Sequence, residues 1–184
     1  MWKIATTVIK GLTIKWKMTR DPIGYAKSIG VRMGENVVIY GMGLGMFGTE
    51  PWLITLGNNV HITMGCVFVT HDGGTLILRK EVPDLEWTAP IVVGNDVYIG
   101  LRSIIMPGVK IGNRVIIGAG SVVTKDIPNN CVAAGVPARV IKSVDDYLEH
   151  MKKKSLHCGH LKGIEKEAVL KRIFGVTTEC SIIK

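Results

Sequence analysis

A six-residue repeat runs through residues 91–123 and limits, more than any other feature, what this chain can fold into. Small or branched apolar residues occupy a first register at Ile91, Val97, Ser103, Val109, Val115 and Ser121. A second register follows two residues later at Val93, Ile99, Ile105, Ile111, Ile117 and Val123. A helix with 3.6 residues per turn cannot keep such a repeat on one face, whereas short strands joined by corners can. The pattern therefore predicts a mainly β solenoid of stacked coils.

The slot after the second register holds Gly94, Gly100, Gly112 and Gly118. We expect the backbone to turn corners there in conformations that a side chain would penalise. Weaker coils precede the strict block, and two shifts of phase mark segments that leave the coil. The first, residues 41–52, is rich in Gly and Met, and the second, at about residues 69–90, is long and polar. A polar loop expelled from a regular solenoid commonly carries function.

The repeat divides the chain into an N-terminal segment (1–28), the solenoid (29–142) and a C-terminal helical tail (143–184). Residues 1–20 mix apolar and basic side chains, and the interleaved charges exclude a membrane span and a secretion signal. We expect a helix that caps the first coil. The alternative is a basic amphipathic helix on an anionic membrane surface. In the tail, Ser143 is expected to cap one exposed helix, and a second short helix should follow.

Composition fits one globular domain of 184 residues, with 47% apolar and 21% charged side chains. Four scattered cysteines lack the spacing of a disulfide framework, so we expect reduced thiols and a cytoplasmic protein. The net charge of +8 suits anionic ligands, but the solenoid lacks the basic runs with interleaved aromatics that are typical of nucleic-acid binding. His157, Cys158 and His160 have no fourth ligand at zinc spacing, so no metal site is predicted.

His71, at the root of the second excursion, is the candidate catalytic residue. Imidazole can accept a proton at neutral pH, and a histidine at the base of an expelled loop can meet a substrate. From position alone, an exposed loop histidine without a role is an equally good interpretation. Asp72, Asp84 and Glu86 are candidates to orient the ring.

The segment Thr70-His71-Asp72-Gly73-Gly74, followed after the excursion by residues 91–100, resembles the sugar and xenobiotic O-acetyltransferase branch of the hexapeptide acyltransferases. Within that branch it is most similar to O-acetyltransferases of polysaccharide biosynthesis. The resemblance covers roughly residues 54–142 and implies a left-handed parallel β-helix. It also implies that His71 is the general base for direct acetyl transfer from acetyl-CoA to a hydroxyl, while a backbone N–H stabilises the oxyanion.

The last coils, residues 118–128 and 134–142, match the part of the family fold that binds coenzyme A. The residues that the resemblance implies for the pantetheine arm are Leu101, Ala119 and Thr124. Those that it implies for the nucleotide phosphates are Lys125, Arg139 and Lys142. Lysine and arginine are the expected protein ligands of phosphate, so the physical chemistry agrees with the resemblance.

The family places its active sites between subunits of a trimer, so the resemblance implies a homotrimer. The expected acceptor is a sugar hydroxyl in surface-polysaccharide synthesis. N-acetylation of a nucleotide-linked amino sugar is the nearest alternative, and a non-catalytic binding solenoid is another. A zinc carbonic anhydrase on the same fold would need three histidine ligands, whereas the solenoid offers only His61 and His71.

Overall fold

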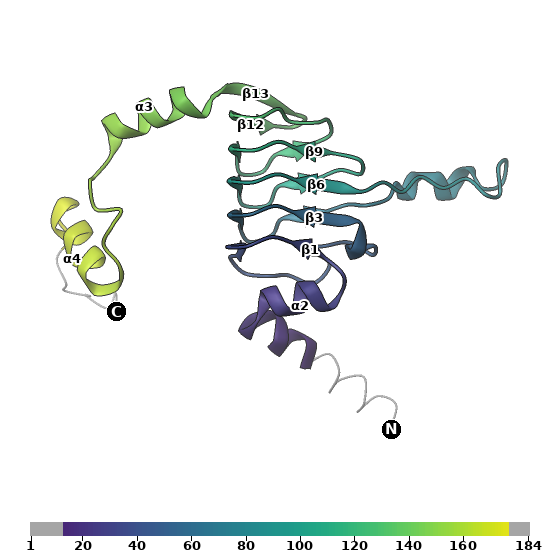
Figure 1. The fold of residues 1–184 in the computed structure, drawn as a ribbon, viewed down its shortest axis with the longest axis horizontal. Coiled ribbons are helices and arrows are strands. Elements are labelled where there is room, and N and C mark those ends of the chain that lie inside the picture. Colours follow the sequence, from purple (N-terminus) through teal and green to yellow (C-terminus); the bar gives the residue numbers. More distant parts are fainter. Residues whose placement is uncertain (1–12, 177–184) are drawn as a thin grey trace, which may run out of the picture. The chain divides into compact units, whose positions relative to one another are not determined.

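The computed structural model describes residues 13–176, whose strands form three sheets, one for each side of a coil (Figure 1). The first sheet contains β1 (Arg32–Met33), β3 (Ile54–Leu56), β6 (Ile91–Val93) and β9 (Lys110–Ile111). The second contains β2 (Val38–Ile39), β4 (Val60–Ile62), β7 (Val97–Ile99), β10 (Val115–Ile117), β12 (Cys131–Gly135) and β13 (Ala138–Ser143). The third contains β5 (Val67–Phe68), β8 (Ile104–Ile105) and β11 (Val122–Val123).

Successive strands along the chain belong to the three sheets in turn, so each strand pairs with a strand one coil away. Val92 pairs in parallel with Lys110, 18 residues further on, as expected for a coil of three six-residue sides. Thr55 pairs with Val92, 37 residues further on, because the second excursion adds 19 residues to that coil. At the C-terminal end of the stack, β13 pairs antiparallel with β12. The predicted parallel β-helix is confirmed.

Both registers of the repeat point into the core. The twelve register residues between positions 91 and 123 are each at most 2% exposed. The two serines among them keep their hydroxyls paired: Ser103 Oγ donates to the Gly100 carbonyl (2.7 Å), and Ser121 Oγ donates to the Gly118 carbonyl (2.5 Å). A buried hydroxyl without a partner would be costly, so these two bonds explain why serine is tolerated inside.

Glycine follows the second register for a different physical reason from the one expected. None of the four glycines lies in the left-handed region, which is occupied two residues later, for example by Asp96 (φ 55°). Instead, a Cβ on Gly94 would lie 2.6 Å from Asn113 Oδ1, and one on Gly100 would lie 2.5 Å from the Ala119 nitrogen. Glycine is needed at these positions because adjacent coils approach too closely for a side chain, not because of backbone torsion.

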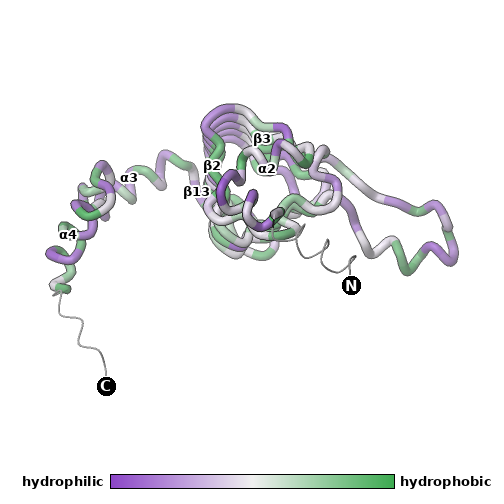
Figure 2. Tube along the Cα trace, turned by 90° about the horizontal axis from the view of Figure 1, so that it is seen from below, coloured by the Kyte–Doolittle hydropathy of each residue, from purple (hydrophilic) through white to green (hydrophobic). Residues whose placement is uncertain are grey.

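The two predicted excursions differ in character. The first folds back onto the core, so that Met46 and Phe47 are at most 3% exposed and Phe47 stacks on Phe68. It leads into the short helix η1 (Pro51–Leu53). The second excursion contains η2 (Gly73–Leu78) and projects sideways from the coils (Figures 1 and 2). No side chain between residues 72 and 88 is buried.

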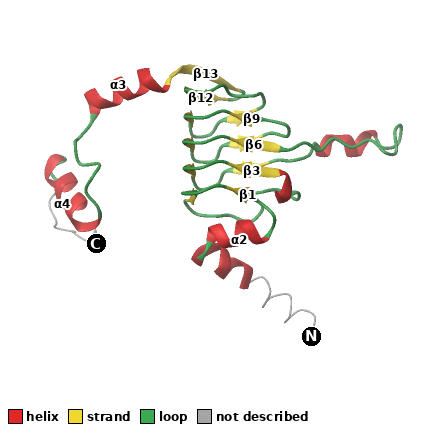
Figure 3. Ribbon diagram, in the orientation of Figure 1, coloured by secondary structure: helices red, strands yellow, loops and turns green. Residues whose placement is uncertain are grey.

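Two helical segments lie at the N-terminal end of the coils (Figure 3). Residues 13–20 are helical, and α2 (Pro22–Ser28) follows directly. The Asp21 carboxylate caps α2 by accepting a hydrogen bond from the Gly24 N–H (2.8 Å). Ala26 is fully buried, and Ile23 packs against the solenoid core. The remainder of the N-terminal segment, residues 1–12, lies outside the described residues.

The C-terminal part contains α3 (Val144–Lys154) and α4 (Gly163–Ile173), and the chain from Tyr147 onward forms a compact unit separate from the solenoid. The predicted cap is confirmed, because Ser143 Oγ accepts a hydrogen bond from the Asp146 N–H (2.9 Å). Neither α3 nor α4 has a buried residue. Within residues 13–176 no helix is long and apolar enough to cross a membrane.

Candidate active site

His71 and Glu50 meet where the two excursions join the coil. The Phe68 N–H donates to the Met46 carbonyl (2.7 Å), which holds the first excursion against β5 and places Glu50 beside the strand end. His71 follows that strand after two residues and forms an antiparallel bridge with Thr88, which closes the base of the second excursion. Two residues that lie 21 positions apart are thereby brought into contact.

The Glu50 carboxylate fixes the histidine ring. His71 Nδ1 lies 3.0 Å from Glu50 Oε2 and 3.2 Å from Thr49 Oγ1. An ionised carboxylate only accepts hydrogen bonds, so Nδ1 carries the ring proton of the neutral imidazole. Nε2 then keeps its lone pair, and within the described residues it has no hydrogen-bond partner. With its side chain 37% exposed, His71 presents an accessible basic nitrogen.

Hydrogen bonds hold the pKa of Glu50 far below its ordinary value of 4.5, at about 2. The largest cause is the Thr70 hydroxyl, which donates to Oε2 at 2.5 Å. The bond to His71 and the Thr49 hydroxyl, which donates to Oε1 at 2.7 Å, lower the pKa further. Donors that favour the charged form in this way keep Glu50 ionised at neutral pH. The carboxylate therefore remains an acceptor for the Nδ1 proton.

A cavity of about 370 Å³ opens beside the pair. Thr49, Glu50 and His71 contribute to its lining, together with Thr75 and Arg79 from the second excursion. The cavity therefore combines a basic nitrogen with several hydrogen-bonding groups. Such a lining suits a polar, hydroxyl-rich molecule better than an apolar one.

The three acidic residues considered from sequence do not orient His71. Asp72 uses its carboxylate to accept the Gly74 N–H (2.9 Å) at the start of η2. Glu86 pairs with Arg79. Asp84 is exposed and makes no hydrogen bond to the ring. Glu50 takes this position instead. No periodic signal marked Glu50 in the sequence, because it lies in the irregular first excursion.

The residues expected to hold the pantetheine arm lie at the ends of strands of successive coils. Leu101 follows β7 and Ala119 follows β10, and the Gly120 N–H donates to the Leu101 carbonyl (2.7 Å), which joins the two corners. Thr124 follows β11 and is exposed. In the described part of the chain the backbone N–H groups of Leu101, Ala119 and Thr124 have no hydrogen-bond acceptor. These donors are available to the amide carbonyls of a ligand.

The cations expected to meet the phosphates are all exposed. Arg139 and Lys142 lie on β13, and Lys125 follows Thr124 directly. Arg139 donates from Nη1 to the Ala138 carbonyl (2.9 Å), which leaves most of its donors unused. Within residues 13–176 of one chain, no hydrogen bond or ion pair joins these cations or the pantetheine corner to His71.

The histidines outside the candidate active site meet no cluster of metal-ligating side chains within residues 13–176. His61 projects from β4 and is paired, since Nδ1 lies 3.0 Å from the Tyr40 hydroxyl and Nε2 lies 3.0 Å from Asn59 Oδ1. Across residues 13–176, no group of three or more His, Cys, Asp or Glu side chains could hold a metal ion.

The strict six-residue repeat is also the part of the chain that matches a known protein family. Residues 90–125 match the model of the bacterial transferase hexapeptide family (six repeats). A solved hexapeptide-repeat acetyltransferase of Vibrio cholerae, complexed with acetyl coenzyme A, is 31% identical, with a TM-score of 0.48 over 62% of this chain and 60% of that chain.

Two relatives resemble a longer part of the chain. The galactoside O-acetyltransferase of Escherichia coli K12 is 38% identical over 130 residues, which cover 70% of this chain and 62% of that protein. Protein CapG of Staphylococcus aureus is 42% identical over 134 residues, which cover 73% of this chain and 76% of CapG. The similarity to CapG, the match of the repeat and the observed coils agree with one another. The chain therefore belongs to the hexapeptide-repeat acetyltransferase family.

Proposed function

We propose that this protein transfers an acetyl group from acetyl-CoA to the hydroxyl of a sugar, in the synthesis of a surface polysaccharide. The observation that carries the proposal is the pair of His71 and Glu50 beside the cavity, with Nδ1 held 3.0 Å from an ionised carboxylate and Nε2 without a hydrogen-bond partner in the described residues. Membership of an acetyltransferase family and similarity to a galactoside O-acetyltransferase support the choice of donor and acceptor.

The proposed reaction is a direct transfer. His71 Nε2 removes the proton of the acceptor hydroxyl as its oxygen attacks the thioester carbonyl carbon. A backbone N–H stabilises the charge that develops on the carbonyl oxygen. When the intermediate collapses, the C–S bond breaks and the departing thiolate takes the proton from Nε2, giving an acetyl ester and CoA. Glu50 stabilises the imidazolium that forms in between, because its carboxylate faces Nδ1.

The donor is proposed to lie along the corners of the later coils. The free N–H groups of Leu101, Ala119 and Thr124 bind the amide carbonyls of the pantetheine arm. Lys125, Arg139 and Lys142 bind the nucleotide phosphates, where flexible ammonium groups and a forked guanidinium are suitable ligands. The acceptor occupies the cavity between His71 and the second excursion.

The decisive experiment measures CoA release from acetyl-CoA in the presence of a panel of sugars, nucleotide sugars and simple alcohols. His71→Ala should lose about 10²- to 10⁴-fold in kcat, the usual contribution of a general base. Glu50→Gln removes the charge but keeps the shape, so it should lower kcat by less and change the acceptor KM little. Glu81→Gln, the same change on an exposed residue of the second excursion, should behave like wild type.

Two results would contradict the proposal. If the wild-type protein binds no acetyl-CoA and releases no CoA with any acceptor, the protein is a binding solenoid. If turnover depends on an acceptor but His71→Ala retains it fully, the base is elsewhere. Turnover only with amino sugars would move the assignment to N-acetylation.

A further inference from the structure

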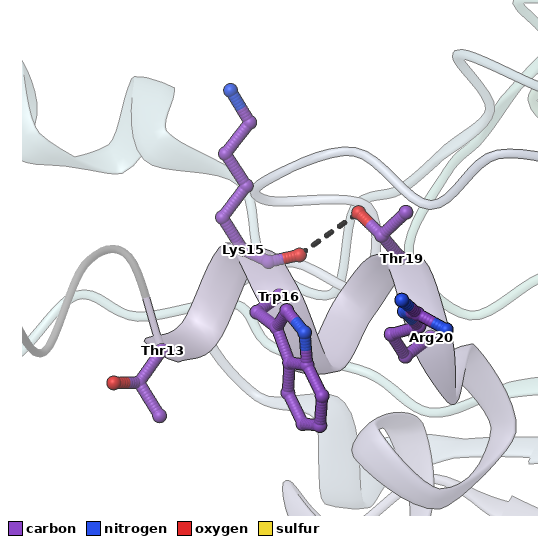
Figure 4. A pocket seen from close by; sticks show the side chains of 5 residues that line it. All are labelled: Thr13, Lys15, Trp16, Thr19 and Arg20. Atoms are coloured by element: carbon purple, nitrogen blue, oxygen red, sulfur yellow. Dashed lines mark hydrogen bonds between the residues drawn. The ribbon is translucent and has the colours of Figure 1, made fainter.

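The N-terminal helical residues 13–20 carry a surface that the acetyltransferase site does not use. A wide, open hollow lies against the exposed side of this helix. Its lining includes Lys15, Trp16 and Arg20. Trp16 and Arg20 project from one side of the helix, while Lys15 extends in another direction (Figure 4).

Trp16 faces away from the protein core. Its side chain is 62% exposed, and Ile14 is also exposed at 38%. Met18, two residues along the helix from Trp16, is only 6% exposed. Residues two apart on a helix lie about 200° apart around its axis, so burial of Met18 turns Trp16 outward. The way the helix is seated therefore keeps the Trp16 indole largely on the surface.

The cations around Trp16 form no ion pair with any other described residue. Lys15, Lys17 and Arg20 take part in none of the ion pairs within residues 13–176. The first 20 residues of the sequence contain five Lys or Arg and no Asp or Glu. The first acidic residue, Asp21, uses its carboxylate to cap α2. Residues 1–28 contain six Lys or Arg and only this one acidic residue, so the segment carries a net positive charge that attracts anions.

We propose that this helix binds the surface of an anionic phospholipid bilayer. Basic side chains that flank an exposed tryptophan fit the boundary between headgroups and acyl chains, where indole is favourably placed and lysine stems can extend to the phosphates. Exposed Ile14 and Trp16 favour lipid over nucleic acid, because the bilayer interface buries both side chains whereas a phosphate backbone offers no apolar surface to Ile14. The contact is peripheral, and it holds the enzyme at the membrane independently of the reaction that it catalyses.

Vesicle co-sedimentation of the full-length protein tests this inference. We expect binding to phosphatidylcholine vesicles that contain phosphatidylglycerol, little binding to pure phosphatidylcholine, and weaker binding as salt increases. Each cation near an anionic bilayer contributes roughly a fivefold gain in partitioning, so Lys15→Gln/Lys17→Gln should lose at least about tenfold. Trp16→Ala should lower partitioning at every salt concentration, because it removes burial rather than charge.

Two matched variants separate the helix from the overall charge of the protein. Lys153→Gln/Lys154→Gln makes the same charge change on exposed lysines of α3, and Trp52→Ala removes a similarly exposed indole of η1. Both should bind vesicles like wild type. The inference is overturned if wild type does not sediment with anionic vesicles, or if the α3 variant loses as much as the helix variant. It is also overturned if a short DNA duplex, and not the vesicles, binds through Lys15 and Lys17.

Discussion

A column of asparagine side chains ties the coils together at one corner of the solenoid. Asn58 Oδ1 accepts the Glu35 N–H, and each following coil repeats the bond, from Asn58 N–H to Asn95 Oδ1, from Asn95 N–H to Asn113 Oδ1, and from Asn113 N–H to Asn129 Oδ1, all at 2.7–2.8 Å. Each bond satisfies a corner N–H that the sheets cannot reach, and contributes on the order of 1 kcal/mol. The glycine before each asparagine leaves room for the asparagine side chain of the next coil, as Gly57 does for Asn95 and Gly94 does for Asn113.

At the same scale, Glu50 makes the free energy of unfolding depend on pH in the acid range. Its pKa is lowered from 4.5 to about 2, so ionised Glu50 favours the folded state. This stabilisation is complete above about pH 4.5 and is lost as the pH falls toward 2. We therefore expect wild type to be more stable than Glu50→Gln at neutral pH, and the difference to shrink as the pH falls through that window. Urea unfolding of both proteins across the window measures it.

The exposed Glu81→Gln variant is the control, because its carboxylate has no partner in the described residues. A difference between wild type and Glu50→Gln that stays constant down to the acid end would contradict the lowered pKa. Such a result would assign the stabilisation to the shape of the Glu50 side chain rather than to its charge.

At the scale of elements, the six-residue repeat predicted the coils, because the need to bury apolar side chains produces that repeat. It could not predict the structure of segments outside the coils, where few side chains are buried. Every residue of the two registers between positions 91 and 123 is inside, as expected. The contact between Glu50 and His71 could not be predicted, because it depends on how an irregular segment returns to β5. For the same reason, the position of Asp72 next to His71 suggested a contact that the cap of η2 replaces.

The second excursion should be dispensable for folding but not for activity. No side chain between residues 72 and 88 is buried, and the bridge between His71 and Thr88 closes the base of the loop without its tip. We expect a variant lacking residues 75–85 to keep its coils and to unfold in one cooperative transition, because the loss removes little apolar area from inside the solenoid. Acetyl transfer should disappear with Thr75 and Arg79, which line the cavity. Differential scanning calorimetry and the CoA-release assay measure the two effects.

Loss of the cooperative transition in that variant would show that the solenoid needs the excursion in order to fold. Full activity would show that the acceptor is held by other residues, and would remove the cavity from the proposed site. Circular dichroism of the variant verifies that the coils are retained before either result is interpreted.

At the scale of the whole molecule, the two parts of the proposed site, the base and the phosphate ligands, are not in contact within one chain. The base lies beside the second excursion, and the proposed phosphate ligands lie on β13 and after β11 without contact to it within residues 13–176. The excursion also exposes apolar side chains, with Leu76 61% and Ile77 80% accessible. Exposed apolar groups on a projecting loop are typical of a contact surface. Both features suit the homotrimer that the resemblance implies, in which we propose that the loop of one subunit reaches the coils of the next.

Mixing two inactive variants tests this assembly. His71→Ala removes the base, and Arg139→Ala/Lys142→Ala removes the phosphate ligands, so each variant alone should be nearly inactive. If each site takes its base from one subunit and its phosphate ligands from a neighbour, co-expression in equal amounts restores about a quarter of the wild-type sites, since each half is intact with even odds. If both halves belong to one chain, no mixed trimer contains an intact site and activity stays at the level of the separate variants. Light scattering of the mixture establishes that three chains are present, and a monomer at working concentration would contradict the trimer directly.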